Sequence, residues 1–248
     1  MKVVDAVWEL RNLGKRTIEV KLEKKDFSRE PVEVYADIED AEKIYHAEYT
    51  VVKMKTGYPQ VGWELQKNGF WHVETQICLR AFYDDVKSCV FQYEQLYSGA
   101  EQKTIDTYDD VTYIKNEIEK GIFSTDRIAL DPFWGIKVAN HRYANWVEDE
   151  YKRGSELSYI SVEGKNVGFV LHRIENKVRN ALLTGVFPQF RSGNYGAFVL
   201  YAGSASMIKK NIKVSYGDVS SNNPAILALN EMFGSRVRFM YDVYTRHK

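Results

Sequence analysis

The chain has 248 residues with 34 Lys and Arg against 34 Asp and Glu, so its formal net charge is zero. A hydrophobic fraction of 44% and a charged fraction of 27% are typical of a globular protein and exclude a disordered one. The longest apolar runs are far shorter than the ~18 residues of a membrane span, and the first ten residues do not form a leader. The sequence therefore predicts a soluble, cytoplasmic protein.

The two cysteines and the distribution of charge exclude further classes. Cys78 and Cys89 are too few for a disulfide framework or a four-cysteine zinc site, and we predict no metal. Residues 1–120 hold 17 basic and 23 acidic side chains, and residues 121–248 hold 17 and 11. This asymmetry is too mild for a nucleic-acid-binding protein, but it suits a small anionic ligand on the C-terminal half.

The first half reads as a small mixed unit. Periodicity predicts strands over 3–10 and 17–22, helices over 37–49 and 60–68, a strand over 70–82 and a helix over 109–120. The spacing of apolar residues changes near 122–125. We therefore predict an N-terminal α+β domain over 1–122 and a second domain over 123–248.

The second half alternates helices and strands. The predicted order is a helix (138–149), a hairpin (158–162 and 167–172), a strand (179–186), a helix (197–209), a strand (213–219), a helix (224–233) and a strand (236–244). The helix ending at Gly234 before a strand repeats the pattern of the helix ending at Gly69. Such units are common, so this echo is only a weak sign of an internal repeat.

Residues 182–196, Leu-Leu-Thr-Gly-Val-Phe-Pro-Gln-Phe-Arg-Ser-Gly-Asn-Tyr-Gly, carry the most specific chemical signal. A strand enters a small turn that opens directly into a helix. Free backbone N–H groups at such a helix start can cradle an anion, and Arg191 would add a charged contact. The alternative is a plain strand-to-helix turn in which glycine supplies positive φ.

The arrangement resembles the acetyl-CoA-binding motif of the GNAT acetyltransferase superfamily, on which Val186, Pro188, Arg191 and Gly196 fall. Asn194 replaces the middle glycine of that motif, and asparagine tolerates left-handed φ. Residues 223–234 resemble a second motif of the superfamily, with agreement at Asn223, Leu229 and Gly234. Asn230 there replaces a tyrosine that often protonates the departing thiolate.

The resemblance implies an α/β (α+β) fold of the GNAT type, in which helices flank a mixed, mostly antiparallel sheet. It also implies acetyl-CoA as the co-substrate, transferred directly from the thioester to an amine. The implied cofactor-binding residues are Thr184, Gly185, Val186, Arg191, Ser192, Gly193, Asn194, Tyr195, Gly196 and Asn223.

The catalytic roles follow from the same resemblance and from the chemistry of the strand. The Val186 N–H is the expected oxyanion donor, and Asn230 stands where the general acid usually lies. No Asp or Glu lies between Arg179 and Arg191, so a base must come from water or a neighbouring element, for which His172 is one candidate. The proton for the thiolate could also come from Tyr195, Tyr216 or Tyr241, although core packing is the commoner role of such rings.

A narrower resemblance, through residues 123–147 and 65–80, is to TDP-fucosamine N-acetyltransferases. It implies an amino-sugar nucleotide as the acceptor, with the N-terminal domain helping to form its pocket. Two alternatives remain: another small amine (an amino acid, a peptide or an antibiotic), or a non-catalytic CoA-binding module. We expect a monomer or homodimer with no nucleic-acid or membrane partner, and Trp134 as the tryptophan most apt to face a ligand.

Overall fold

The computed structural model describes residues 1–248 as ten strands and eight helices. The first part of the chain forms β1 (Lys2–Asp5), α1 (Trp8–Leu13), β2 (Thr17–Lys21), α2 (Pro31–Tyr45), β3 (Tyr49–Lys55), α3 (Pro59–Lys67) and β4 (Trp71–Phe82). The remainder forms α4 (Tyr83–Tyr97), β5 (Ala100–Thr104), α5 (Tyr108–Glu119), α6 (Gly135–Lys152), β6 (Glu156–Val162), β7 (Lys165–Glu175), β8 (Val178–Val186), α7 (Tyr195–Lys209), β9 (Val214–Ser220), α8 (Pro224–Met232) and β10 (Arg236–His247). Short 3₁₀ turns lie at Asp26–Ser28 and Pro188–Phe190.

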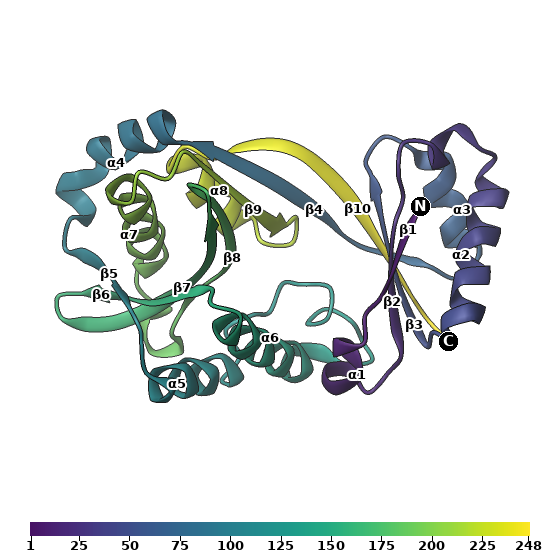
Figure 1. Cartoon of the computed structure of the whole chain (residues 1–248), viewed down its shortest axis with the longest axis horizontal. Coiled ribbons are helices and arrows are strands. Elements are labelled where there is room, and N and C mark those ends of the chain that lie inside the picture. The colour runs from purple at the N-terminus through teal and green to yellow at the C-terminus, as the bar shows by residue number, and fades with distance from the viewer.

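All ten strands belong to one mixed sheet in the order β1-β2-β3-β10-β4-β9-β8-β7-β6-β5. Only the pairs β2–β3 and β8–β9 are parallel. Two lobes are visible in Figure 1, with β1 to β3, α2 and α3 in one and β5 to β9, α7 and α8 in the other. The long strands β4 and β10 run from lobe to lobe. The predicted fold class, a mostly antiparallel α+β sheet flanked by helices, is confirmed.

The two lobes repeat one sequence of elements. The unit β2-α2-β3-α3-β4 in the first part corresponds to β8-α7-β9-α8-β10 in the second. Both α3 and α8 begin with proline and have nine residues, and each precedes a strand of 12 residues. Their first flanking residues, Tyr58 and Asn223, have φ/ψ of −122°/65° and −123°/68°. Gly69 and Gly234 follow with φ of 83° and 86°.

The last strands of the two units are exchanged. β10, from the end of the chain, pairs with β3 of the first unit, whereas β4 pairs with β9 of the second. β4 and β10 also pair with each other at the centre of the sheet. Each lobe therefore contains a strand from the other half of the sequence.

Each lobe has its own apolar core. In the first, side chains of β2 and β3, such as Ile18 and Val52, pack on α2 and α3. In the second, one core lies toward α5 and α6 and another lies under α7 on the opposite face of the sheet. Because α5 packs on α6 and β5 pairs with β6, residues 83–120 lie with the C-terminal lobe. The apolar strand faces thus position the helices on both sides of the sheet.

Five elements differ from the sequence-based prediction. The expected first strand is split, because residues 8–13 turn into α1. The helix expected over 37–49 begins earlier, at Pro31, and ends where His46 takes a left-handed φ of 49°. The next residues form β3, which was not predicted, and α4 and β5 were also missed. No helix of the structure has the length and apolarity to cross a membrane.

Candidate functional site

Strands β8 and β9 part from each other halfway along their length. Val178–Ala181 of β8 pair with Val214–Gly217 of β9, but β8 continues to Val186 without a β9 partner. Beyond Gly217, β9 pairs only with β4. The parted strands leave a V-shaped gap whose vertex lies at Ala181 and Gly217. Backbone groups of 182–186 on the β9 side are therefore free to bind a ligand.

The orientation of the free groups follows from the pairing of β8 with β7. The Phe187 N–H donates to the carbonyl of Val167 on the β7 side, at 2.9 Å. Because successive N–H groups of a strand point in opposite directions, the N–H groups of Val186 and Thr184 point into the gap. A bulge at Leu182, between the pairs Leu171–Leu183 and His172–Ala181, accompanies the divergence. This geometry suits a backbone donor aimed at a ligand carbonyl.

A short turn follows the gap and leads into α7. After Pro188–Phe190, residues 191–194 are exposed, and α7 starts at Tyr195 with no side chain capping it and no acidic residue in its first turn. The first N–H groups of α7 are therefore open to an anion. Exposed Arg191 stands at the lip, where its guanidinium donates to the carbonyl of Gly121 at 2.5 Å and has no carboxylate partner.

The glycines of this turn lie close to neighbouring side chains and do not have positive φ. A Cβ on Gly193 would lie 2.7 Å from the ring of Tyr195, and one on Gly196 would lie 3.2 Å from Leu229 of α8. Asn194 has a φ of −80°, so the left-handed conformation expected for it is wrong. Asparagine at this position meets no backbone penalty.

The two asparagines of α8 are held by their own helix. Asn223 caps the helix, since its side-chain oxygen accepts from the N–H of Ile226 at 3.2 Å. The Asn230 amide donates to the carbonyl of Ile226 at 2.9 Å. An amide cannot supply a titrating proton, so Asn230 offers no general acid.

His172 lies apart from this gap. It is only 4% exposed, and its ring carbon comes near Gly203 of α7 on the face opposite α5 and α6. Burial lowers the pKa of His172 well below its usual value, and the nearby charges of Arg179 and Lys210 add to the shift. The structure encloses this ring in the lobe, so the interpretation of His172 as a base finds no geometric support.

Asp218 is a carboxylate directly after the vertex residue Gly217, and nothing in the sequence had marked it. It follows Gly217, the last residue of β9 paired with β8. Its side chain is exposed and accepts from the Gln76 amide at 2.6 Å. Burial raises the pKa of the Cys78 thiol to about 12, and Asp218 beside it contributes. Only the pairing of β4 with β9 reveals this cluster, since Cys78 and Asp218 are 140 residues apart.

The segment between α5 and α6 borders the gap. Asn140, fully buried, holds Phe123 through its N–H at 2.8 Å and its carbonyl at 2.7 Å. Farther along, Ser220 of β9 donates to the carbonyl of Thr125 at 3.3 Å. Trp134, expected to face a ligand, instead packs edge-on against Tyr49, with ring centroids 4.6 Å apart. These hydrogen bonds and ring contacts thus fix residues 121–134 in place beside the gap.

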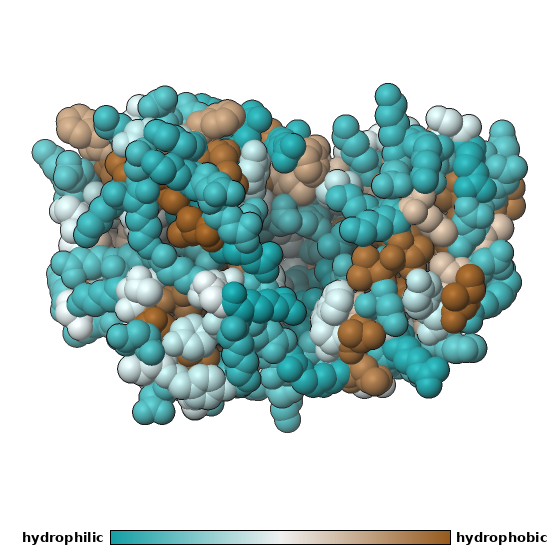
Figure 2. All heavy atoms as spheres, viewed as in Figure 1, coloured by the Kyte–Doolittle hydropathy of each residue, from teal (hydrophilic) through white to brown (hydrophobic).

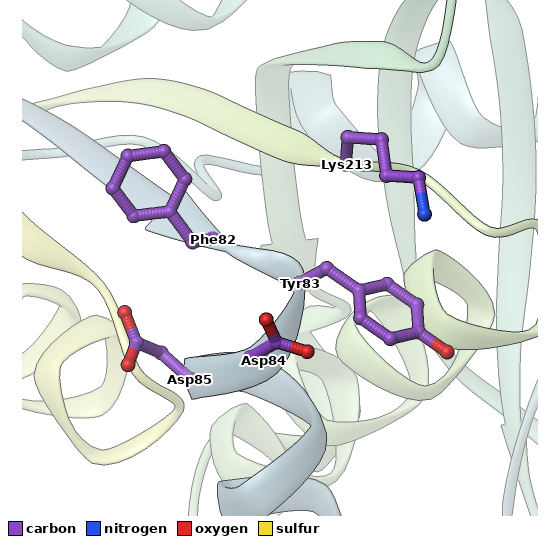
Figure 3. Close-up of a pocket in the computed structure, with 5 residues that line it drawn as sticks. All are labelled: Phe82, Tyr83, Asp84, Asp85 and Lys213. Carbon is purple, nitrogen blue, oxygen red and sulfur yellow. The ribbon is translucent and has the colours of Figure 1, made fainter.

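Another hollow lies where β4 ends and α4 begins. It measures about 480 Å³ and is bordered by Phe82, Tyr83, Asp84, Asp85 and Lys213 (Figure 3). The Lys213 ammonium lies 5.2 Å from the centroid of the Tyr83 ring. Lys213 follows the C-terminal end of α7, whereas the uncapped helix end is at its start, roughly 22 Å away for a helix of 15 residues. This hollow is not part of the gap.

Comparisons with known proteins place the fold. A GCN5-related N-acetyltransferase from Sphaerobacter thermophilus superposes with a TM-score of 0.61 at 12% identity, over 93% of this chain and 73% of that one. One from Kribbella flavida gives 0.52 at 13%, over 93% and 81%. A tandem GNAT protein from the clavulanic acid biosynthesis pathway gives 0.54 at 10%, over 87% and 69%.

No family model matches the sequence, and no curated protein does. The likeness to these solved structures is therefore one of fold, the GNAT fold predicted from residues 182–196 and 223–234.

Proposed function

We propose that the chain is an acetyl-CoA-dependent N-acetyltransferase. The observation that carries the proposal is the parting of β8 and β9 directly before an uncapped helix start. The gap offers backbone donors for a thioester arm, and the helix start offers N–H groups for a pyrophosphate. Both features lie on one continuous stretch of chain, at the spacing that one extended cofactor needs.

In the proposed reaction the chain's own groups bind, orient and polarise. Arg191 and the first N–H groups of α7 hold the phosphates, and the Val186 N–H stabilises the oxyanion as the amine attacks the thioester carbonyl. The new C–N bond forms, the C–S bond breaks, and the thiolate takes up a proton as the attacking amine loses one. Because a thiol has a pKa of about 8.5, the thiolate leaves near neutral pH without an acid at Asn230.

For the acceptor we propose an amino-sugar nucleotide. It would bind where the molecule is hollowed between the two lobes (Figure 2). The resemblance of residues 123–147 to TDP-fucosamine N-acetyltransferases supports this class. The pairing of β4, a strand of the first unit, with β9 beside the gap also supports it. Ligand sites commonly lie between such lobes. We infer a cytoplasmic enzyme acting as a monomer or homodimer. The second candidate is a CoA-binding module without turnover, favoured by the amide at Asn230.

Calorimetric titration with acetyl-CoA tests the proposal. We expect one site per chain with a Kd below roughly 100 μM, about −5.5 kcal/mol or stronger. A stoichiometry of one follows because all five residues of β2 stay paired with β3, so the first unit has no gap. Arg191→Glu should weaken binding by ~1.5–3 kcal/mol, the scale of a charged hydrogen bond.

The matched control is Arg16→Glu, since Arg16 is also exposed but lies in the first lobe, before β2. Unchanged affinity in Arg191→Glu, or equal losses in both variants, would contradict the assignment of the turn. Acetyl-CoA binding without acetylation of any amine would favour the binding module.

A further inference from the structure

One face of β10, β4 and β9 carries basic and aromatic side chains beside the gap. Ile77, Leu79 and Val219 of these strands pack toward Ile226 and Leu227 of α8. Because neighbouring residues of a strand point to opposite faces, the alternate residues form the face turned away from α8. We name this surface the cleft floor, and it includes Gln76, Cys78, Arg80, Tyr216, Asp218, Arg238 and Phe239. The molecule is hollowed between the two lobes in Figure 2.

Two arginines of the cleft floor have no acidic partner. The Arg80 guanidinium lies 4.3 Å from the centroid of the Phe82 ring. That of Arg238, at a bulge of β10, lies 5.3 Å from the Tyr216 ring and 4.9 Å from the Phe239 ring. Neither guanidinium forms an ion pair, unlike those of Arg127, Arg142 and Arg246. A guanidinium stacked on a ring keeps its N–H edge free for an oxyanion.

The arginines lie close to Asp218 and to the vertex of the gap. Cys78 is paired with Asp218, and Arg80, two residues farther along β4, is paired with Tyr216. Two residues of a strand span about 7 Å. Exposed Asp218 therefore follows the vertex residue Gly217, the backbone of Arg80 lies about one strand repeat from that of Cys78, and Arg238 lies in the bulge of β10 opposite Cys78 and Leu79.

This arrangement divides the cleft floor by charge. A carboxylate attracts an ammonium group, and two guanidinium forks match the charge of a phosphate dianion better than that of a carboxylate. The helices α7 and α8 lie on the other face, so a cofactor whose phosphates sit at the start of α7 would reach the cleft floor only through the gap. An amine on Asp218 would meet the thioester there.

We propose that the cleft floor binds an acceptor bearing both an amine and a phosphate, with the amine against Asp218 and the phosphate against Arg80 and Arg238. This inference rests on the proposed function and names the residues that would hold the phosphate and the amine of its acceptor. Arg80 and Arg238 are specificity-determining residues that hold the end of the acceptor remote from the reacting nitrogen.

Calorimetry with glucosamine 6-phosphate and glucosamine as probes tests the proposal. Free CoA is present at saturation, so that the phosphate site proposed at the start of α7 is already filled. The unsubstituted protein should bind the phosphate ester at least tenfold more tightly than glucosamine. The double variant Arg80→Met/Arg238→Met should lose this preference, and Arg16→Met, a matched exposed arginine, should keep it. Asp218→Asn should weaken the binding of both amines and leave the binding of inorganic phosphate unchanged. The control Asp106→Asn should leave the binding of both amines unchanged.

Equal affinities for the two probes, a preference that survives the double substitution, or no binding of either probe would overturn the proposal. If the double variant does not fold, Arg238→Gln at the exposed bulge replaces it, and its preference should fall at least threefold. Acetyl-CoA binding with no phosphate preference would refute the cleft floor alone. A failure of acetyl-CoA to bind would instead refute the proposed function, and the probes can then be titrated without CoA.

Discussion

The ion pair between Glu9 and Arg142 joins the two lobes and offers a stringent test of the packing. Glu9 of α1 is 1% exposed, and Arg142 of α6 donates to it through Nε at 2.7 Å and 2.9 Å. Burial opposes the charge of Arg142, but Glu9 keeps the pKa of Arg142 above its usual value. Arg142→Met would leave a buried carboxylate without its partner.

Removing one member of a buried pair costs about 3–5 kcal/mol, because the remaining charge has lost both water and its partner. For a chain of this length, the melting temperature should fall by roughly 6–20 °C. Replacing both residues, in Glu9→Leu/Arg142→Met, should recover much of the loss, since no unpaired charge then remains. Urea unfolding and calorimetry of the two single variants and the double variant measure the coupling.

The chain supplies a matched control on the same two helices. Arg11 and Asp149 form a pair at 2.6 Å, but their side chains are 51% and 31% exposed. Solvent screens such a pair, so Arg11→Met should cost at most about 1 kcal/mol. The reasoning fails if Arg142→Met lowers the free energy of unfolding no more than Arg11→Met does. It also fails if the double variant loses more unfolding free energy than its two single variants together.

Two further predictions concern Asn230 of α8 and Glu148 of α6. Asn230→Tyr should leave acetyl-CoA affinity nearly unchanged, because the Asn230 amide bonds only to its own helix, and should raise turnover by supplying a proton; a tenfold loss of affinity in calorimetry would contradict this. Glu148 bonds Lys115, Lys152 and Tyr108, which lower its pKa to about 2. Its stabilising contribution should be present above about pH 4.5 and lost toward pH 2. Glu148→Gln should therefore unfold more easily in urea at pH 7 but match the parent at pH 2.

The sequence predicted the second lobe well because its signals are local. The turn of residues 187–194 has its own glycine and proline chemistry, and α8 begins after Asn223, which caps it, and is followed by Gly234. The strand β3 was missed because Tyr49 and the residues before it continue a helical spacing of apolar side chains. Only pairing with β2 and β10 on both sides decides that 49–55 are extended.

Site residues brought together by distant pairing were beyond a local reading. Asp218 gains its position from β4, which belongs to the other half of the sequence, and no spacing near Asp218 marks it. The burial of His172 was beyond a local reading for the same reason. Alternation places His172 on one of two strand faces, but only the packing of α7 shows that this face is buried.

The exchange of β4 and β10 explains why a duplicated scaffold can carry one site. In the first unit β2 stays paired with β3 along its whole length, and Glu33 in the first turn of α2 disfavours an anion there. In the second unit the strands part, and the first turn of α7 has no acid. Yet Gln76, Cys78 and Arg80 of the cleft floor come from the first unit through β4. The first lobe thus lacks the features that we propose bind the cofactor, and it contributes through the exchanged strand the surface on which we expect the acceptor to lie.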